Sequence, residues 1–238
     1  MRVLSVDYDY FFHADETAIP FLPDGGSEFD GLMDVVWSNN YAGSRLRDDV
    51  LIKGTHIDTE SLSAVKEIID RNQSARYMIS DSHKYAYGFI LVETEYGEKS
   101  DIWHIDFHHD VYPRGNEVHC GNWLGKLIEN GHTESVHWIG REDSDRSSMS
   151  CPLPAADMAE LPDTFDLIFI CRSGWWTPPH LDSYFVDSLA MPVINGKRRV
   201  KYEAGINSSR YSQAFRSTVD ELAEVYRRVP KEAFHAHH

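Results

Sequence analysis

The densest group of chemically reactive side chains in the sequence is the segment DFHHD at residues 106–110, directly after the apolar residues 102–105. Side chains two residues apart point the same way in an extended chain, so Asp106, His108 and Asp110 are expected on one side of a strand end. Two carboxylates and an imidazole this close repel or need costly desolvation unless a cation joins them. The motif therefore predicts metal ligation, although an ordinary polar loop after a strand can have the same composition.

Two other predicted strand ends carry the same residue types. The segment SVDYD at residues 5–9 ends the first apolar stretch, and SDSH at residues 80–83 follows another. The three strand ends together supply four carboxylates and two imidazoles, from Asp7, Asp9, His83, Asp106, His108 and Asp110. Four negative charges balance two divalent cations, and oxygen-dominated ligation with imidazole suits manganese, with iron, cobalt, nickel or zinc as substitutes. The sequence therefore predicts two Mn²⁺ ions held by these six residues.

Short apolar segments alternate with helix-like stretches along the chain, which predicts a three-layer α/β fold with a mostly parallel sheet. Strands are predicted at Val3–Phe12, Arg76–Ile79, Phe89–Glu93, Ile102–Phe107, Ser135–Ile139 and Asp166–Cys171. Helices are predicted after a cap at Asp58, over Asn122–Asn130 with a stop at Gly131, and from Tyr211 to Val229. No linker divides residues 1–238, so we expect a single domain.

Two segments fall outside this alternation. Residues 13–50 hold few periodic signals and several turn formers, so we expect a long insertion of the kind that forms a lid or a disordered loop. The tail Phe234–His238 carries three histidines, which we expect to fray rather than to bind metal.

Composition narrows the classes of partner. A net charge of −15 argues against nucleic acid or an anionic membrane surface as partner, because both require clustered Lys and Arg. No run of about 18 apolar residues is present, so no membrane span is expected. Cys120, Cys151 and Cys171 lack paired spacing, and no signal-peptide pattern precedes the first strand. These features favour reduced thiols in the cytoplasm.

The motifs resemble those of the arginase and agmatinase family, the ureohydrolases. The residues at 106–110 match its DxHxD signature, those at 5–9 its SxDxD signature, and Asp81-Ser82-His83 its isolated metal-binding histidine. The segment CGNWLG at 120–125 falls where arginases carry a substrate-binding Ser-Gly-Asn, and IGREDSD at 139–145 is similar to a later family segment. The resemblance implies an arginase-like architecture, two manganese ions and hydrolysis of a guanidinium group to urea.

The chain also departs from the arginase pattern. SxDxD precedes DxHxD here, whereas it follows in arginases, and Leu124 stands where a histidine is expected. No glutamate is assigned to the guanidinium. The permuted order, the segment 120–125 and WWTPP at 175–179 look instead like the peptide-arginase branch. That resemblance implies an arginine-containing precursor peptide as partner, with arginine residues converted to ornithine.

The resemblance also implies roles for individual residues. Asp110 would ligate metal and accept a hydrogen bond from the attacking hydroxide. His119 is favoured as proton donor to the leaving amine, because strand alternation points His109 away from the metals. The residues expected to bind substrate are Asn122, Asp145 and Trp176. Two further histidines inside predicted strands, His104 and His137, are expected to be satisfied core residues.

Three other functions remain open from the sequence. An aspartyl-phosphate phosphatase would use Asp7 as nucleophile and Asp9 as acid and base, but it leaves residues 106–110 without a role. A related amidine or amide hydrolase, agmatinase-like or a deacetylase, would share the metal motifs. A metal-binding protein without turnover is the third, and Leu124 is its best argument.

Overall fold

The computed structural model describes residues 1–23, 28, 31–95, 97–113, 115–195, 200–202 and 210–228. The strands are β1 (Arg2–Asp7), β2 (Phe12–Ala14), β3 (Thr55–Ile57), β4 (Arg76–Ser80), β5 (Ser100–Ile105), β6 (Thr133–Ile139), β7 (Leu167–Cys171) and β8 (Val200–Tyr202). The α-helices are α1 (Met33–Arg45), α2 (Val50–Lys53), α3 (Thr59–Arg71), α4 (Lys84–Glu93), α5 (Trp123–Glu129), α6 (Asp182–Phe185), α7 (Met191–Asn195) and α8 (Gln213–Arg228). Short 3-10 turns lie at Tyr8–Phe11, Ile19–Phe21, Met158–Glu160 and Pro179–Leu181, and a π-helical turn at Val186–Ala190 joins α6 to α7.

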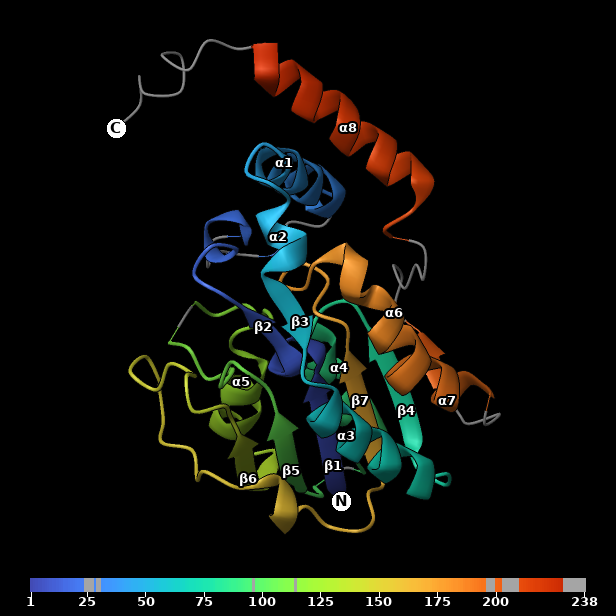
Figure 1. Ribbon diagram of the computed structural model, residues 1–238. Coiled ribbons are helices and arrows are strands. Elements are labelled where there is room, and N and C mark those ends of the chain that lie inside the picture. The colour runs from blue at the N-terminus through green and yellow to red at the C-terminus, as the bar shows by residue number, and fades with distance from the viewer. Residues whose placement is uncertain are drawn as a thin grey trace.

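Six strands form a parallel sheet in the order β6-β5-β1-β7-β4-β8 (Figure 1). The two short strands β2 and β3 pair antiparallel in a separate ribbon. In the large sheet β1 lies between β5 and β7, although these strands are far apart along the chain. This order brings the carboxyl ends of β5, β1, β7 and β4 side by side at one edge of the sheet.

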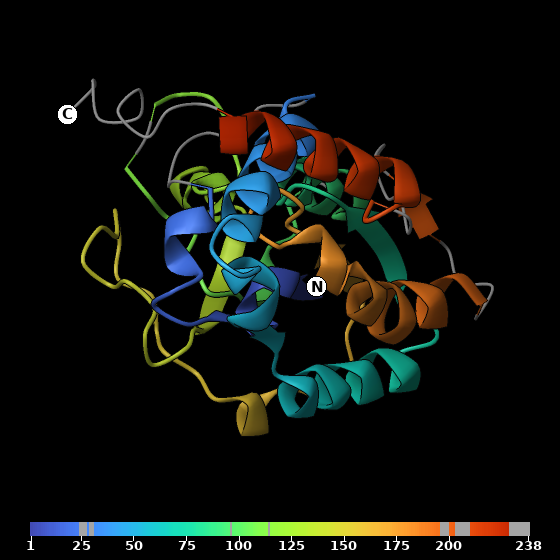
Figure 2. The same ribbon diagram turned by 45° about the horizontal axis from the view of Figure 1, so that its top comes forward.

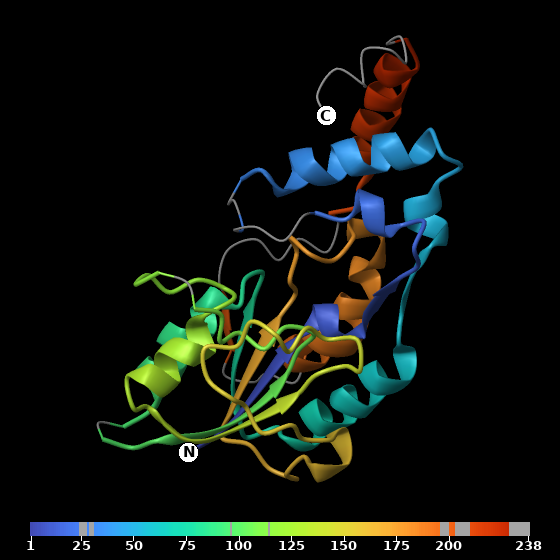
Figure 3. The same ribbon diagram turned by 90° about the vertical axis from the view of Figure 1, so that its left-hand side faces the viewer.

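Helices cover both faces of the large sheet. One apolar cluster joins α3 and the α6–α7 segment to alternate strand residues, such as Leu4 and Ile170. A second cluster joins α4 and α5 to the intervening strand residues, such as Val3 and Phe169. Figure 3 shows α5 and α3 on opposite sides of the strands. The predicted three-layer α/β fold with a parallel sheet is therefore confirmed.

A third cluster lies beyond the carboxyl ends of the strands. Trp37 and Tyr41 of α1 pack there with Leu51 of α2 and with Phe215 and Val219 of α8. Figures 1 and 2 show α8 lying across α1, and Figure 1 shows both helices at the end of the molecule opposite the amino terminus. The chain thus builds a helical cap over the edge of the sheet to which the predicted ligands belong.

Two predicted helices begin and end as their sequences indicate. The Asp58 side chain accepts hydrogen bonds from the backbone of Glu60 and Ser61 and caps α3. The apolar face of α3 buries Leu62 and Val65 together with Ile68 and Ile69. Helix α5 is followed by Gly131, whose positive φ of 72° suits glycine. Helix α8 extends to Arg228, and Val229 lies outside the described residues.

The predicted strand Phe89–Glu93 was wrong, since this segment is the second half of helix α4. Its short apolar run does not distinguish a buried strand from a buried helix by periodicity. Ala86, Phe89 and Ile90 keep helical spacing and fill the space between the sheet and α5. The predicted strand Val3–Phe12 is also too long, because the Asp7 side chain caps a 3-10 turn that ends β1.

Residues 13–50 are more regular than the sequence indicated. They include the 13-residue helix α1, whose buried side chains are mixed with Ser38 and Ser44 and therefore give a weak apolar period. The tail Phe234–His238 lies outside the described residues. Within the described ranges no helix is both long and apolar enough to cross a membrane.

Candidate metal centre

Strand register places the predicted ligands at one level of the sheet. Asp7, the last residue of β1, pairs with Cys171 of β7, and Cys171 also pairs with Ser80 of β4. On the other side of β1, Val6 pairs with Ile105, the residue before Asp106. The loops that follow β4, β5 and β1 therefore start next to one another. All six predicted ligands meet here, and we call them the Asp/His cluster (Asp7, Asp9, His83, Asp106, His108 and Asp110).

His83 is the centre of one set of donor atoms. Its Nδ1 lies 2.9 Å from Asp7 Oδ2, 3.1 Å from Asp106 Oδ2 and 3.5 Å from Asp110 Oδ2. On the other side of the ring, Nε2 is 2.7 Å from the Ser5 hydroxyl. Metal-bound histidines have this pattern, with one nitrogen toward the ion and the other fixed by a hydrogen bond. We call His83 Nδ1 and the Oδ2 atoms of Asp7, Asp106 and Asp110 the His83 group.

His108 forms a second set with Asp9 and the other oxygen of Asp106. Its Nδ1 lies 3.0 Å from Asp9 Oδ2 and 3.8 Å from Asp106 Oδ1. We call these atoms the His108 group. Because Asp106 contributes Oδ2 to the His83 group and Oδ1 to the His108 group, its carboxylate joins the two. Asp106 is therefore common to two groups of donor atoms that could hold a metal ion.

Burial makes this concentration of charge costly. The four carboxylate residues of the cluster are each at most 4% exposed. Among the described residues, Asp9 Oδ1 and Asp106 Oδ2 have no hydrogen-bond partner. Buried carboxylate oxygens without donors are expensive unless a cation compensates them. The donor set and its unsatisfied atoms therefore fit divalent metal ions.

The pKa values of the metal-free site also show that ionised carboxylates are unfavourable here. Burial raises the pKa of Asp106 well above its ordinary value, and the carboxylates of Asp110, Asp9 and Asp7 raise it further. Burial likewise raises the pKa of Asp110 to about 6, against the lowering effect of His83 and His108. Burial lowers the pKa of His108, but the charge and hydrogen bond of Asp9 together with the Asp110 and Asp7 carboxylates outweigh burial and raise the pKa to about 9. The cluster therefore retains protons that a metal ion would displace.

The loop after β5 is held in an unusual conformation. Asp110 has a positive φ of 53°, a left-handed conformation in which Asp and Asn are the best tolerated residues after glycine. Its Oδ2 accepts a hydrogen bond of 2.5 Å from the Trp123 indole, the first residue of α5. The Asp106 carboxylate accepts a 2.7 Å hydrogen bond from the His108 backbone. Helix α5 and the loop itself thus fix the direction of both carboxylates.

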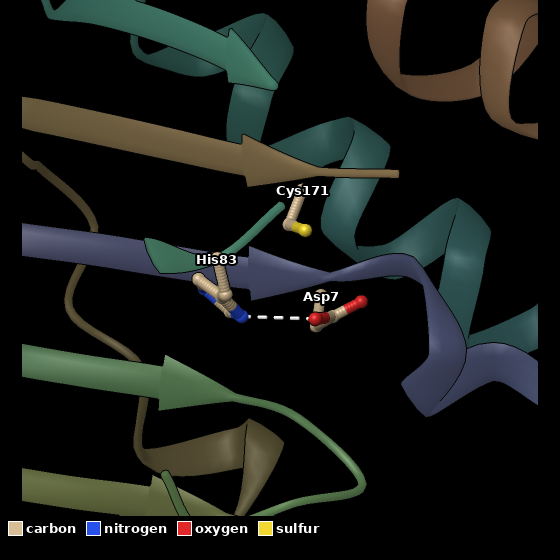
Figure 4. A group of neighbouring side chains, drawn as sticks. All are labelled: Asp7, His83 and Cys171. Carbon is tan, nitrogen blue, oxygen red and sulfur yellow. Dashed lines mark hydrogen bonds and ion pairs between the residues drawn. The ribbon is translucent and has the colours of Figure 1, made fainter. Parts of the chain in front are cut away.

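Cys171 and His104 also lie against the cluster. The Cys171 sulfur lies beside Asp7, which is hydrogen-bonded to His83 (Figure 4). Burial raises the pKa of this thiol well above its ordinary value, and a thiol is a poor ligand compared with a thiolate. His104 lies beneath the carboxylates, with Nε2 3.3 Å from Asp106 Oδ2. Buried groups of His, Asp and Cys that could hold a metal ion are thus present around Asp7 and Asp106.

Each of the two strand histidines matches only part of the expectation of a satisfied core residue. His104 is fully buried, but neither ring nitrogen has a hydrogen-bond partner among the described residues. His137 is half-buried, stacks on Trp103 and lies 3.3 Å from Asp101 Oδ1. Alternation along β5 explains the first case, because His104 lies two residues before Asp106 and shares its face of the strand.

A cavity of about 490 Å³ opens above the cluster. Its walls include three of the predicted substrate and proton-transfer residues, His119, Asp145 and Trp176. The Trp176 ring centroid is 5.8 Å from that of His108, whereas Asp145 is exposed at the rim. His109 packs on Tyr112 with its Nδ1 accepting a backbone hydrogen bond, and it faces away from the cluster as expected.

Asn122 does not line this cavity. Its Oδ1 accepts a hydrogen bond from the His119 backbone, and its Nδ2 donates to the Glu117 carbonyl. Asn122 therefore holds the loop that carries His119, and the prediction of direct substrate contact is not supported by its position. The sequence motif located the correct loop, but the direction of the side chain depends on how the loop turns before α5.

Glu28 is a cavity residue that sequence reasoning missed. It lines the wall above Asp7 and accepts a hydrogen bond from the Ser82 hydroxyl. Burial raises the pKa of Glu28 to about 7, and the Asp7 carboxylate contributes in the same direction. The segment 13–50 lacks a motif that marks this glutamate, and only the fold brings it next to the loop after β4.

No protein-family model, curated protein or solved structure matches this chain at a significant level.

Proposed function

We propose that the protein is a metal-dependent hydrolase that removes urea from an arginine residue of a peptide and leaves ornithine. One observation carries the proposal: five buried ligands and the half-buried His108 form two donor groups that share Asp106, and four of the six line a cavity. Four carboxylates balance two divalent cations, and their oxygen-rich ligation suits Mn²⁺. When bound, two such cations supply Lewis acidity and lower the pKa of water toward neutrality.

The cavity is suited to a cationic group. Glu28, Asp110 and Asp145 line it, and none of its described lining residues is Lys or Arg. A guanidinium ion gains charge-assisted hydrogen bonds from such carboxylates. The same property disfavours a phosphatase, because a phosphate ester needs positive charge or donors around its oxygens. The Asp7 oxygen that would attack phosphorus instead contacts His83 and Ser173.

Asp110 and His119 each have a role in the proposed reaction. The water oxygen bonds to the guanidinium carbon, the bond from this carbon to Nε breaks, and the leaving nitrogen takes up the two water protons. Asp110 holds the water through a hydrogen bond, and His119 passes a proton to the leaving amine. Gly121 donates a backbone hydrogen bond to His119 Nδ1, so the neutral ring carries its proton on Nε2.

A peptide substrate fits the wall of the cavity better than free arginine. Free arginine brings an α-amino and an α-carboxylate group, and burying these charges requires partners of both signs. The described wall offers carboxylates, imidazoles and the aromatic side chains of Tyr112 and Trp176, but no Lys or Arg side chain for the α-carboxylate. An arginine within a chain presents neutral amides, which can lie against aromatic rings at the rim. The three free cysteines are consistent with a cytoplasmic enzyme.

The test is incubation of the Mn²⁺-loaded protein with an arginine-containing peptide and, separately, with free arginine. Conversion to ornithine makes the peptide about 42 mass units lighter, and urea appears in equal amount. Asp110→Asn serves as the inactive control. Faster turnover of free arginine would refute the peptide substrate. Metal uptake without urea from either substrate would favour an amide hydrolase or a binding protein.

A further inference from the structure

His104 is a buried imidazole with no role in the six-residue ligand set. It lies on β5 with no exposed surface, edge-on to Trp123 at 5.4 Å and edge-on to His83 at 5.2 Å between ring centroids. Neither of its nitrogens has a hydrogen-bond partner among the described residues. A side chain with two polar atoms is rarely left unsatisfied in a core, so this one requires an explanation.

The position of His104 Nε2 explains why this imidazole has no hydrogen-bond partner. Nε2 lies 3.3 Å from Asp106 Oδ2 and 3.8 Å from Asp110 Oδ2, the same two oxygens that His83 Nδ1 approaches at 3.1 and 3.5 Å. The two imidazoles therefore approach one pair of carboxylate oxygens. His83, His104 and Asp106 each offer one ligand atom, and these three atoms lie within 4.8 Å of one another.

These separations match those of atoms bound to one ion. Two donors that each bind at about 2.1 Å lie about 3.0 Å apart at a right angle and about 3.4 Å apart at a tetrahedral angle. The distances from Asp106 Oδ2 to the two imidazole nitrogens, 3.1 and 3.3 Å, fall within this interval. Asp106 Oδ2 is therefore at a distance from each imidazole nitrogen at which both can bind the same cation.

We propose that His104 Nε2 is a further ligand of the ion held by the His83 group, and that it shifts the preference of this position toward nitrogen-binding metals. This inference rests on the metal centre of the proposed function. Imidazole favours Co²⁺ and Zn²⁺ over Mn²⁺, both in ligand type and in the general order of affinities. The centre then contains three imidazoles rather than two, and the His83 position differs from the His108 position in metal preference.

The first experiment measures binding, without turnover. Metal-free wild type and His104→Gln are titrated calorimetrically with Co²⁺ and with Mn²⁺. The ratio of the two affinities at the tighter position should fall about tenfold or more in His104→Gln, since a metal-site nitrogen is lost. The matched control is His137→Gln, which changes a strand histidine paired with Asp101 outside the cluster. This control should keep the wild-type ratio.

Glutamine retains an N–H donor, so it also tests the rival role in which His104 only donates a hydrogen bond to Asp106. In that case His104→Gln would preserve the metal preference and overturn the proposal. Pulsed electron paramagnetic resonance of the Mn²⁺-loaded wild type with ¹⁵N-labelled histidine gives a readout independent of the variant's folding. Three coupled imidazole nitrogens are expected, and two would overturn the proposal while leaving the two-metal centre intact. No uptake of either metal by the wild type would instead refute the centre itself.

Discussion

Asp110→Asn should stabilise the metal-free protein and weaken the metal-loaded one. Asparagine has nearly the same shape, and its amide oxygen can still accept the Trp123 hydrogen bond. It also tolerates the left-handed backbone at this position, where alanine would add strain. The substitution therefore removes little besides a negative charge, and the effect of this charge can be isolated.

The magnitude follows from the pKa of Asp110, which burial raises to about 6. A carboxyl group whose pKa is raised by folding contributes stability below its unfolded value, near pH 4, and loses this contribution as the pH rises through about 6. At pH 8 the ionised Asp110 thus costs the metal-free protein on the order of 3 kcal/mol, which asparagine avoids. For a chain of this size, that corresponds to a rise in Tm of roughly 6–12 °C.

The assay is thermal unfolding of the chelator-treated and Mn²⁺-loaded proteins at pH 4.5 and pH 8. The Tm of metal-free Asp110→Asn should exceed that of the metal-free wild type at the higher pH only. The increase in Tm caused by Mn²⁺ should be smaller in the variant because a charged ligand is lost. Turnover should fall much more than substrate affinity. Asp101→Asn is the control, because hydrogen bonds from Ser135 and other neighbours outweigh burial and lower the pKa of this carboxyl. It should destabilise both forms. Equal destabilisation of both forms by Asp110→Asn, or near-normal kcat, would refute the role given to Asp110.

Three further predictions concern other residues of the site. Elemental analysis should find about two ions in the wild type, about one in Asp9→Asn and the fewest in Asp106→Asn, because only Asp106 serves both donor groups; equal loss in both variants would contradict a shared carboxylate. The raised pKa of His108, about 9, means that its protonated form stabilises the metal-free fold fully below about pH 6.5 and that this stability is lost as the pH rises through about 9. Calorimetry at pH 7.5 in buffers of different ionisation enthalpy should therefore show proton release on Mn²⁺ binding, and binding without proton release would contradict this protonation state. Finally, Glu28→Gln should lower kcat/KM for an arginine peptide about 10- to 100-fold, and it should remove a rise in activity near pH 7 that follows ionisation of Glu28; an unchanged pH profile would show that Glu28 does not contact the substrate.

The Asp/His cluster could be predicted because each of its residues lies within a few positions of an apolar strand in the sequence. The ligands lie at or just after the ends of apolar strands, so their position at one edge of the sheet could be predicted, although the loop after β5 and the 3-10 turn after β1 set the directions of the side chains. Carboxyl ends of parallel strands meet at one edge of a sheet, which makes three separate strand ends predictive of one site. The caps of α3 and α5 were readable for the same reason, since Asp58 and Gly131 act within one turn of the helix they bound.

Tertiary structure decided what depends on residues far apart in the chain. The order β5-β1-β7-β4 determines which oxygens of Asp106 face His83 and which face His108, and no local pattern contains this order. Glu28 lines the cavity next to the loop after β4, where the Ser82 hydroxyl donates a hydrogen bond to it, and no local pattern predicts this contact. The apolar run at Phe89–Glu93 is part of a helix because Phe89 and Ile90 pack against the face of the sheet together with α5. Side-chain direction, burial and the resulting pKa values arise from packing between distant segments, so they are properties of the folded chain alone.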